Sequence, residues 1–144
     1  MACWAEVQGL EGVAQFMYAQ SDEERVHMLK LIKYVNERGG HAQITALSAP
    51  KTTYGTLNEM FEELYAHELF VSQSINELVG VTFEQKDYAT HNFIQWYVAE
   101  QIEEEAQAKT ILDKIKMIGD DKGGLYLFDR DIQTMTVVSA AATP

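Results

Sequence analysis

The sequence is poor in two residue types that would point to common classes of protein. Cys3 is the one cysteine in 144 residues, so an intrachain disulfide and a cysteine-rich zinc site are both excluded. Pro50 and Pro144 are the two prolines. Because proline interrupts helices, the long stretches without it allow long helices.

Basic residues and long apolar runs are also scarce. There are 11 Lys and Arg residues against 22 Asp and Glu, which gives a net charge of −11. This balance argues against binding nucleic acid or an anionic membrane through a basic surface, but it suits metal cations. No apolar run approaches the ~20 residues that span a bilayer, and the N-terminus lacks the basic region of a secretory signal. We therefore expect a cytoplasmic protein with neither nucleic-acid nor membrane partners.

The composition and the helical periodicity of the sequence predict a single all-α domain over residues 1–144. Apolar residues make up 47% and charged residues 23%, which is typical of a globular chain. Glycines separate segments with helical periodicity, and Thr56 with Glu59 forms a capping signal at the start of one of them. A long connection is expected at 40–54. We expect the end of a first helix at 1–9 and further helices at 11–38, 56–79 and 84–118. The C-terminal tail, 119–144, is expected to be a loop with a short docked piece.

Polar residues interrupt the apolar stripes of the three long predicted helices at mid-length. Positions spaced three and four apart share one helix face. On 56–79 this face is apolar except for Glu68, and on 84–118 it contains Gln101 and Glu104. On 11–38 it contains Glu24 and His27. All three helices thus place polar groups on the face that is expected to be buried.

Converging buried carboxylates repel one another and need a cation. Carboxylates with one imidazole suit divalent iron or manganese, and Glu24-x-x-His27 has the spacing of carboxylate-bridged metal sites in helical bundles. Each feature alone has a simpler reading. Glu24 and His27 could be a solvated pair, Glu68 an interface salt bridge, and EQIEEE at 100–105 a solvated acidic face.

Longer strings carry a resemblance to a known family. These are GLEGVAQFMYAQSDEERVHMLKLIKYVNERGG, LNEMFEELYAHELFVSQSINEL, HNFIQWYVAEQIEEEAQAKTILDKI and GGLYLFDRDI. The chain resembles the bacterial non-heme ferritins over essentially its whole length. The resemblance implies a ferritin-like four-helix bundle with a long crossover between the second and third helices. It also implies iron storage in a homo-oligomeric cage of twenty-four subunits.

The resemblance further implies a di-iron ferroxidase centre that oxidises Fe(II) with dioxygen or peroxide, without heme. Glu24 matches the carboxylate that bridges the two irons, and His27 matches the imidazole on the first iron. Glu68 and Glu104 match ligands of the second iron, with Gln101 beside it. A possible third iron site corresponds to Glu23, Glu100 and Glu103, with Glu104 shared.

The family's first helix is longer than residues 1–9 and carries one more iron-binding glutamate. We therefore expect a truncated first helix, in either a fragment or a degenerate member of the family. This leaves a non-catalytic iron-binding or cage subunit with an incomplete centre as the alternative function. A peroxide-consuming rubrerythrin would need a second Glu-x-x-His, where this chain has Gln101-x-x-Glu104. The acid excess disfavours a DNA-binding mini-ferritin.

Overall fold

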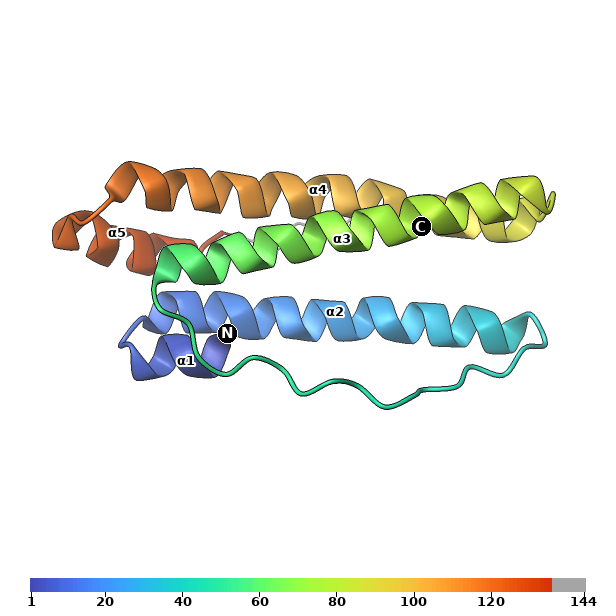
Figure 1. Ribbon diagram of the computed structural model, residues 1–144, viewed down its shortest axis with the longest axis horizontal. Helices are drawn as coiled ribbons and strands as arrows, with labels where there is room; N and C mark the ends of the chain where they lie inside the picture. Colours follow the sequence, from blue (N-terminus) through green and yellow to red (C-terminus); the bar gives the residue numbers. More distant parts are fainter. Residues whose placement is uncertain (136–144) are drawn as a thin grey trace. The chain divides into compact units, whose positions relative to one another are not determined.

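The computed structural model describes residues 1–135, and within them all regular secondary structure is helical and there is no strand (Figure 1). The remaining residues of the predicted tail, 136–144, lie outside this part. The helices are α1 (Ala2–Val7), α2 (Glu11–Glu37), α3 (Leu57–Glu84), α4 (Tyr88–Ile118) and α5 (Lys122–Ile132). They belong to two compact units. The first comprises Met1–Thr53 and the described residues from Tyr126 to Met135, and the second comprises Tyr54–Leu125.

The core of the first unit lies around the beginning of α2. The short helix α1 packs against α2, and the chain turns between them at Gly9, whose φ of 76° suits glycine. The last turns of α5 add two more apolar side chains. The buried apolar residues of this unit are Ala5, Val13, Ala14, Phe16, Met17, Phe128 and Ile132.

A residue distant in sequence caps the N-terminus of α2. The N-cap residue Leu10 has no side chain that can accept a hydrogen bond from the helix. Instead, the backbone N–H of Val13 donates to Oδ1 of Asp129 on α5 at 2.9 Å. A Cβ atom at Gly12 would overlap the backbone carbonyl of Asp129. Glycine at this position therefore allows the close approach of α5 on which the cap depends.

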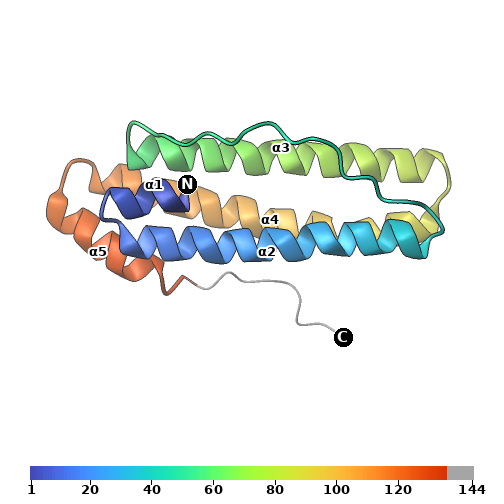
Figure 2. The ribbon, with the colours of Figure 1, turned by 90° about the horizontal axis from the view of Figure 1, so that it is seen from below.

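The other end of α2 confirms the helix stop that the sequence predicts. Arg38 follows the last helical residue, and Gly39 takes a φ of 82°. The N–H of Gly40 donates to the carbonyl of Val35 at 2.9 Å, which satisfies an otherwise orphaned helix end. The predicted connection at 40–54 is confirmed because these residues form neither helix nor strand. The connection runs back parallel to the length of α2 (Figures 1 and 2).

The second unit is a hairpin of two long helices, α3 and α4, which lie side by side (Figures 1 and 2). The predicted cap at the start of α3 is confirmed, since the hydroxyl of Thr56 accepts from the N–H of Glu59 at 3.1 Å. The Glu59 carboxylate accepts from the N–H of Gly55 at 2.9 Å. The buried apolar side chains of the two helices are Met60, Phe61, Ile94, Tyr97, Ala108, Ile111, Leu112 and Ile115.

The turn between α3 and α4 is shorter than the sequence predicts. Helix α3 continues to Glu84 instead of ending at 79, and α4 begins at Tyr88 instead of 84. Gly80 was expected to end the third helix, but a helix interior tolerates an isolated glycine at a modest cost. The actual stop is at Lys86, whose φ is 58°, and Asp87 then caps α4 by accepting from the N–H of Thr90 at 3.0 Å.

In the tail, where the sequence predicts a loop with a short docked piece, residues Lys122–Ile132 form the helix α5. Asp121 accepts hydrogen bonds from the N–H groups of Gly123 and Gly124, and Phe128 and Ile132 bury one face of the helix. Among the described helices, none combines the length and apolar character that crossing a membrane requires.

Candidate metal centre

The buried face of α4 holds the densest set of predicted site residues. The residues that share this face are Ile94, Tyr97, Gln101, Glu104, Ala108, Ile111 and Ile115, and all are buried. Gln101 is 6% exposed and Glu104 is 8% exposed. Glu100, on the adjoining position, is 1% exposed, and both of its carboxylate oxygens are buried. The helical periodicity thus buries one carboxamide and two carboxylates on the same side of α4.

Helix α3 brings Glu68 directly to Gln101. Glu68 is 6% exposed. The side-chain N–H group of Gln101 (Nε2) lies 3.2 Å from the backbone oxygen of Glu68 and 3.3 Å from its Oε2. Both oxygens can only accept, so the nitrogen of the carboxamide faces α3. The structure therefore joins two of the residues that the sequence placed on different helices.

Two further residues extend this contact, and neither is among the predicted site residues. Ser72 lies one turn after Glu68 on α3, and its Oγ is 3.4 Å from Nε2 of Gln101. The Ser72 hydroxyl also donates to the carboxylate of Glu105 on α4. Ser72 could have been found from its spacing, because residues four apart on a helix share a face. The sequence alone did not indicate that Glu105 reaches across to α3.

Helix α2 places Glu24 and His27 side by side, as their spacing predicts. Nδ1 of His27 is 3.6 Å from Oε2 of Glu24. His27 is buried, but the side chain of Glu24 is 54% exposed, and Leu31 further along the same stripe is 37% exposed. The expected burial of the whole stripe is wrong. Burial on this face therefore differs from one position to the next, since His27 is 7% exposed and Glu24 is not buried.

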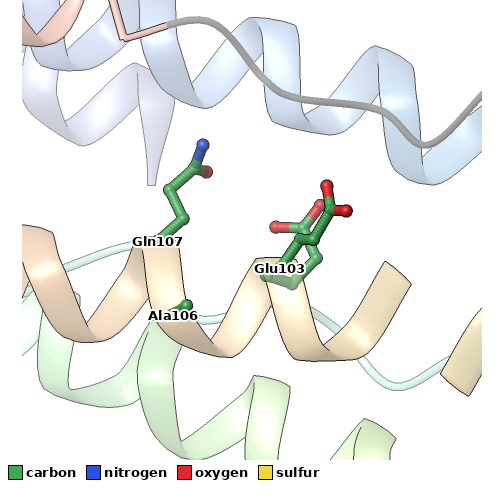
Figure 3. A pocket seen from close by; sticks show the side chains of 4 residues that line it. Glu103, Ala106 and Gln107 are labelled. Atoms are coloured by element: carbon green, nitrogen blue, oxygen red, sulfur yellow. The ribbon is translucent and has the colours of Figure 1, made fainter. Parts of the chain in front are cut away.

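The remaining predicted residues, Glu23 and Glu103, differ in exposure. Glu23 is half-buried with both carboxylate oxygens buried, and Glu103 is exposed. The side chains of Glu103, Glu104, Ala106 and Gln107 line a cavity of about 290 Å³ beside α4 (Figure 3). In Figure 3 the Glu103 carboxylate and the Gln107 carboxamide extend from the same side of the helix. Acidic oxygens at a cavity can attract and bind small cations.

These groups match the chemistry of a hard divalent cation. Carboxylate and amide oxygens with an imidazole suit manganese or ferrous iron, whereas a soft-metal site would need thiolates. A buried carboxylate is costly unless a cation or hydrogen bonds compensate its charge. Glu68, Glu100 and Glu104 on the α3–α4 hairpin are each at most 8% exposed, so all three carboxylates need such compensation.

Comparison with known proteins now decides the family. Residues 1–118 match the family described as the ferritin-like domain. The chain belongs to the ferritin family. It is 47% identical over 136 residues to a probable bacterial non-heme ferritin-like protein of Haemophilus influenzae, covering 94% of this chain and 82% of that protein. It is 42% identical to a bacterial non-heme ferritin of Campylobacter jejuni, covering 95% of this chain and 82% of the relative.

Solved ferritin structures agree with this assignment. An open-pore ferritin from Archaeoglobus fulgidus is 40% identical, with a TM-score of 0.92 over 94% of this chain and 84% of the other. The all-α, ferritin-like four-helix bundle that the sequence predicts is thereby confirmed as the fold class. The identity of the individual metal ligands in this ferritin stays a prediction.

Proposed function

We propose that this chain is an iron storage protein with ferroxidase activity. The observation that carries the proposal is the buried polar cluster of the α3–α4 hairpin, where Glu68, Gln101 and Glu104 are each at most 8% exposed. Membership of the ferritin family supports the same function. Iron is the substrate and the cargo of this reaction.

The proposed iron ligands lie on α2 and on the α3–α4 hairpin. Glu24 and His27 on α2 would bind the first Fe(II). Glu24 would also bridge to the second Fe(II), which Glu68 and Glu104 would bind beside Gln101. Glu23, Glu100 and Glu103 would bind a third iron, with Glu104 shared. Carboxylates bind both oxidation states of iron, so the same side chains can hold the ion before and after oxidation.

The reaction needs an electron acceptor and a route out for the product. Two Fe(II) ions release one electron each, and together these reduce one dioxygen molecule to peroxide with uptake of two protons. The protein positions the ions, and the redox chemistry belongs to the metal and dioxygen. Acidic side chains such as Glu103 would attract incoming cations and pass Fe(III) toward a mineral. We propose that the mineral forms inside a cytoplasmic cage of twenty-four identical subunits.

Anaerobic addition of Fe(II) followed by air tests this proposal. The expected result is rapid growth of the Fe(III)–oxo absorbance, faster than in buffer and faster than in the double variant Glu68→Ala/Glu104→Ala. Glu84→Ala, an exposed position at the end of α3, is the matched control and should oxidise iron at the wild-type rate. Oxidation no faster than in buffer would contradict the ferroxidase proposal.

The alternative function, a non-catalytic iron-binding or cage subunit, gives a different result in the same experiment. Its motivation in the structure is the exposure of Glu24, which leaves the α2 part of the centre loosely held. Fe(II) binding in anaerobic titration without rapid oxidation in air would favour it. Size-exclusion chromatography with and without iron then shows whether the chain assembles into a shell.

A further inference from the structure

Ser72 is an inner member of a hydrogen-bonded chain that crosses three times between α3 and α4. It is half-buried, one turn beyond Glu68, and it is not among the predicted metal ligands. Its Oγ contacts Nε2 of Gln101 at 3.4 Å and also the carboxylate of Glu105. Gln101 in turn contacts Glu68. The order of the chain is thus Glu105, Ser72, Gln101, Glu68.

The donor and acceptor at each hydrogen bond of this chain follow from the chemistry of the side chains. A carboxylate only accepts, so the single hydroxyl proton of Ser72 points at Glu105. The lone pairs of the Ser72 oxygen are then left for the N–H group of Gln101, which can only donate. A hydroxyl that lacked the Glu105 acceptor could rotate and turn its proton toward Gln101. Glu105 therefore fixes which side of the Ser72 hydroxyl faces the carboxamide.

The same chain fixes the carboxamide of Gln101. Its nitrogen faces three acceptors, namely the backbone oxygen of Glu68, Oε2 of Glu68 and Oγ of Ser72. A flipped carboxamide would place its oxygen against all three and lose every one of these bonds. The amide oxygen of Gln101 is consequently held on the side away from α3, and Oε2 of Glu68 is engaged by the amide nitrogen.

We propose that Ser72, oriented by Glu105, is a positioning residue for the iron-binding carboxylate of Glu68. By holding Gln101 against Oε2 of Glu68, it fixes the orientation in which this carboxylate meets the cation. Glu105 acts through Ser72 and is not itself a ligand, although it is the neighbour of Glu104. Successive helix positions point about 100° apart, which separates the roles of the two acids. This inference rests on the proposed function because it assigns a role at the same iron site.

Redox-inert metal binding tests the proposal without relying on iron oxidation. Co(II) is titrated anaerobically into the full chain, and its affinity and visible absorption band are recorded. Ser72→Ala should weaken Co(II) binding roughly 10-fold and change the band, because loss of a residue that orients a ligand lowers metal affinity by about that factor or more. Ser72→Thr keeps the hydroxyl and should restore both the affinity and the band.

Ser74→Ala is the matched control for this experiment. Ser74 lies on the same helix, is exposed, and bonds only to the carbonyl of Phe70 within α3. Its loss should leave the affinity and the band unchanged. Glu105→Ala breaks the chain from its other end and should reproduce the Ser72→Ala result. If Ser72→Ala fails to fold, Glu105→Ala decides the question: weakened Co(II) binding supports the proposal, and wild-type binding overturns it.

The remaining outcomes separate this inference from the proposed function. Wild-type affinity and band in Ser72→Ala would overturn the positioning role, while rapid iron oxidation by the wild type would leave the ferroxidase proposal intact. Equal weakening in Ser72→Ala and Ser72→Thr would also overturn it, because the hydroxyl would then not be the cause. A wild-type chain that neither binds Co(II) nor oxidises iron contradicts the proposed function and this inference together.

Discussion

The stripes of α2 and α4 have the same sequence pattern but different environments. Each places polar residues in the middle of an apolar helix face. On α4 every residue of the stripe is buried, including Gln101 and Glu104. On α2 the stripe is buried at Met17 and His27, but Glu24 is 54% exposed.

The difference shows what periodicity decides and what it leaves open. Periodicity selects the face of a helix that turns inward, and it does so on both helices. Periodicity does not decide whether each position of that face is covered. On α2, His27 is 7% exposed, whereas Glu24, three residues earlier, has a side chain that is 54% exposed. On α4, the polar residues Gln101 and Glu104 are both buried.

The largest expected effect tests whether the α3–α4 hairpin carries its own core. Phe61 is fully buried there, and Phe61→Ala should lower the free energy of unfolding by about 3–5 kcal/mol through loss of apolar burial and the cavity left behind. Thermal or urea unfolding measures this change. Phe83→Ala on the same helix, where the side chain is 66% exposed, is the control and should change stability by less than about 0.5 kcal/mol. Similar losses for the two variants would mean that α3 does not distinguish an inner face from an outer one.

A pair of glycine substitutions compares the two units directly. Gly12→Ala should destabilise the chain by about 1–3 kcal/mol, because the new Cβ meets the backbone of Asp129 on α5. Gly80→Ala on α3 meets no atom within 4 Å and should instead stabilise by about 0.5–1 kcal/mol through higher helix propensity. Denaturant unfolding of both variants measures the difference. Two changes of the same sign would contradict the close packing of α5 on α2.

A pair of neutralising substitutions tests the difference in burial at the two carboxylates. Glu68→Gln removes a buried charge and should raise metal-free stability by about 0.5–2 kcal/mol, at the expense of metal binding. Glu24→Gln, at a side chain that is 54% exposed, should leave metal-free stability nearly unchanged. Unfolding in the presence of a chelator measures both effects. A gain in metal-free stability from Glu24→Gln as large as that from Glu68→Gln would contradict the difference in burial between the two carboxylates.

The smallest expected effect concerns Tyr18 in the α1–α2 unit. Its hydroxyl lies 3.7 Å from Sγ of Cys3 and donates to Glu6 at 3.2 Å. The contact with Cys3, followed by desolvation and the Glu6 carboxylate, raises the pKa of Tyr18 to about 12. Because the folded-state pKa lies above the ordinary value, these contacts stabilise the fold at neutral pH. That contribution is lost as the pH rises from about 10 toward about 12.

The phenolate absorbance of the wild type minus that of Tyr18→Phe isolates this titration. Cys3→Ser should move the midpoint back toward the ordinary value, since Cys3 is the first cause of the shift. A midpoint near pH 10 in the wild type would show that α1 does not hold these groups against α2.

Much of the fold was predictable because its causes are local. The long helices, the cap at Thr56 and the stop at Gly39 follow from periodicity, capping chemistry and glycine conformation. Helix α5 was not predictable from the same signals. It forms because Asp121 caps it and because Phe128 and Ile132 find a core, and that core exists only after residues far apart in sequence have met.

The sequence by itself determined the helical class, the face of each long helix that turns inward, and the choice of Glu68, Gln101 and Glu104 as its interior polar residues. These depend on spacing along one chain segment. Only the tertiary structure decided that Glu105 reaches Ser72, that Asp129 caps α2, and that Glu24 stays accessible. Each of these depends on how close a second segment comes and how far it extends, which no local pattern specifies.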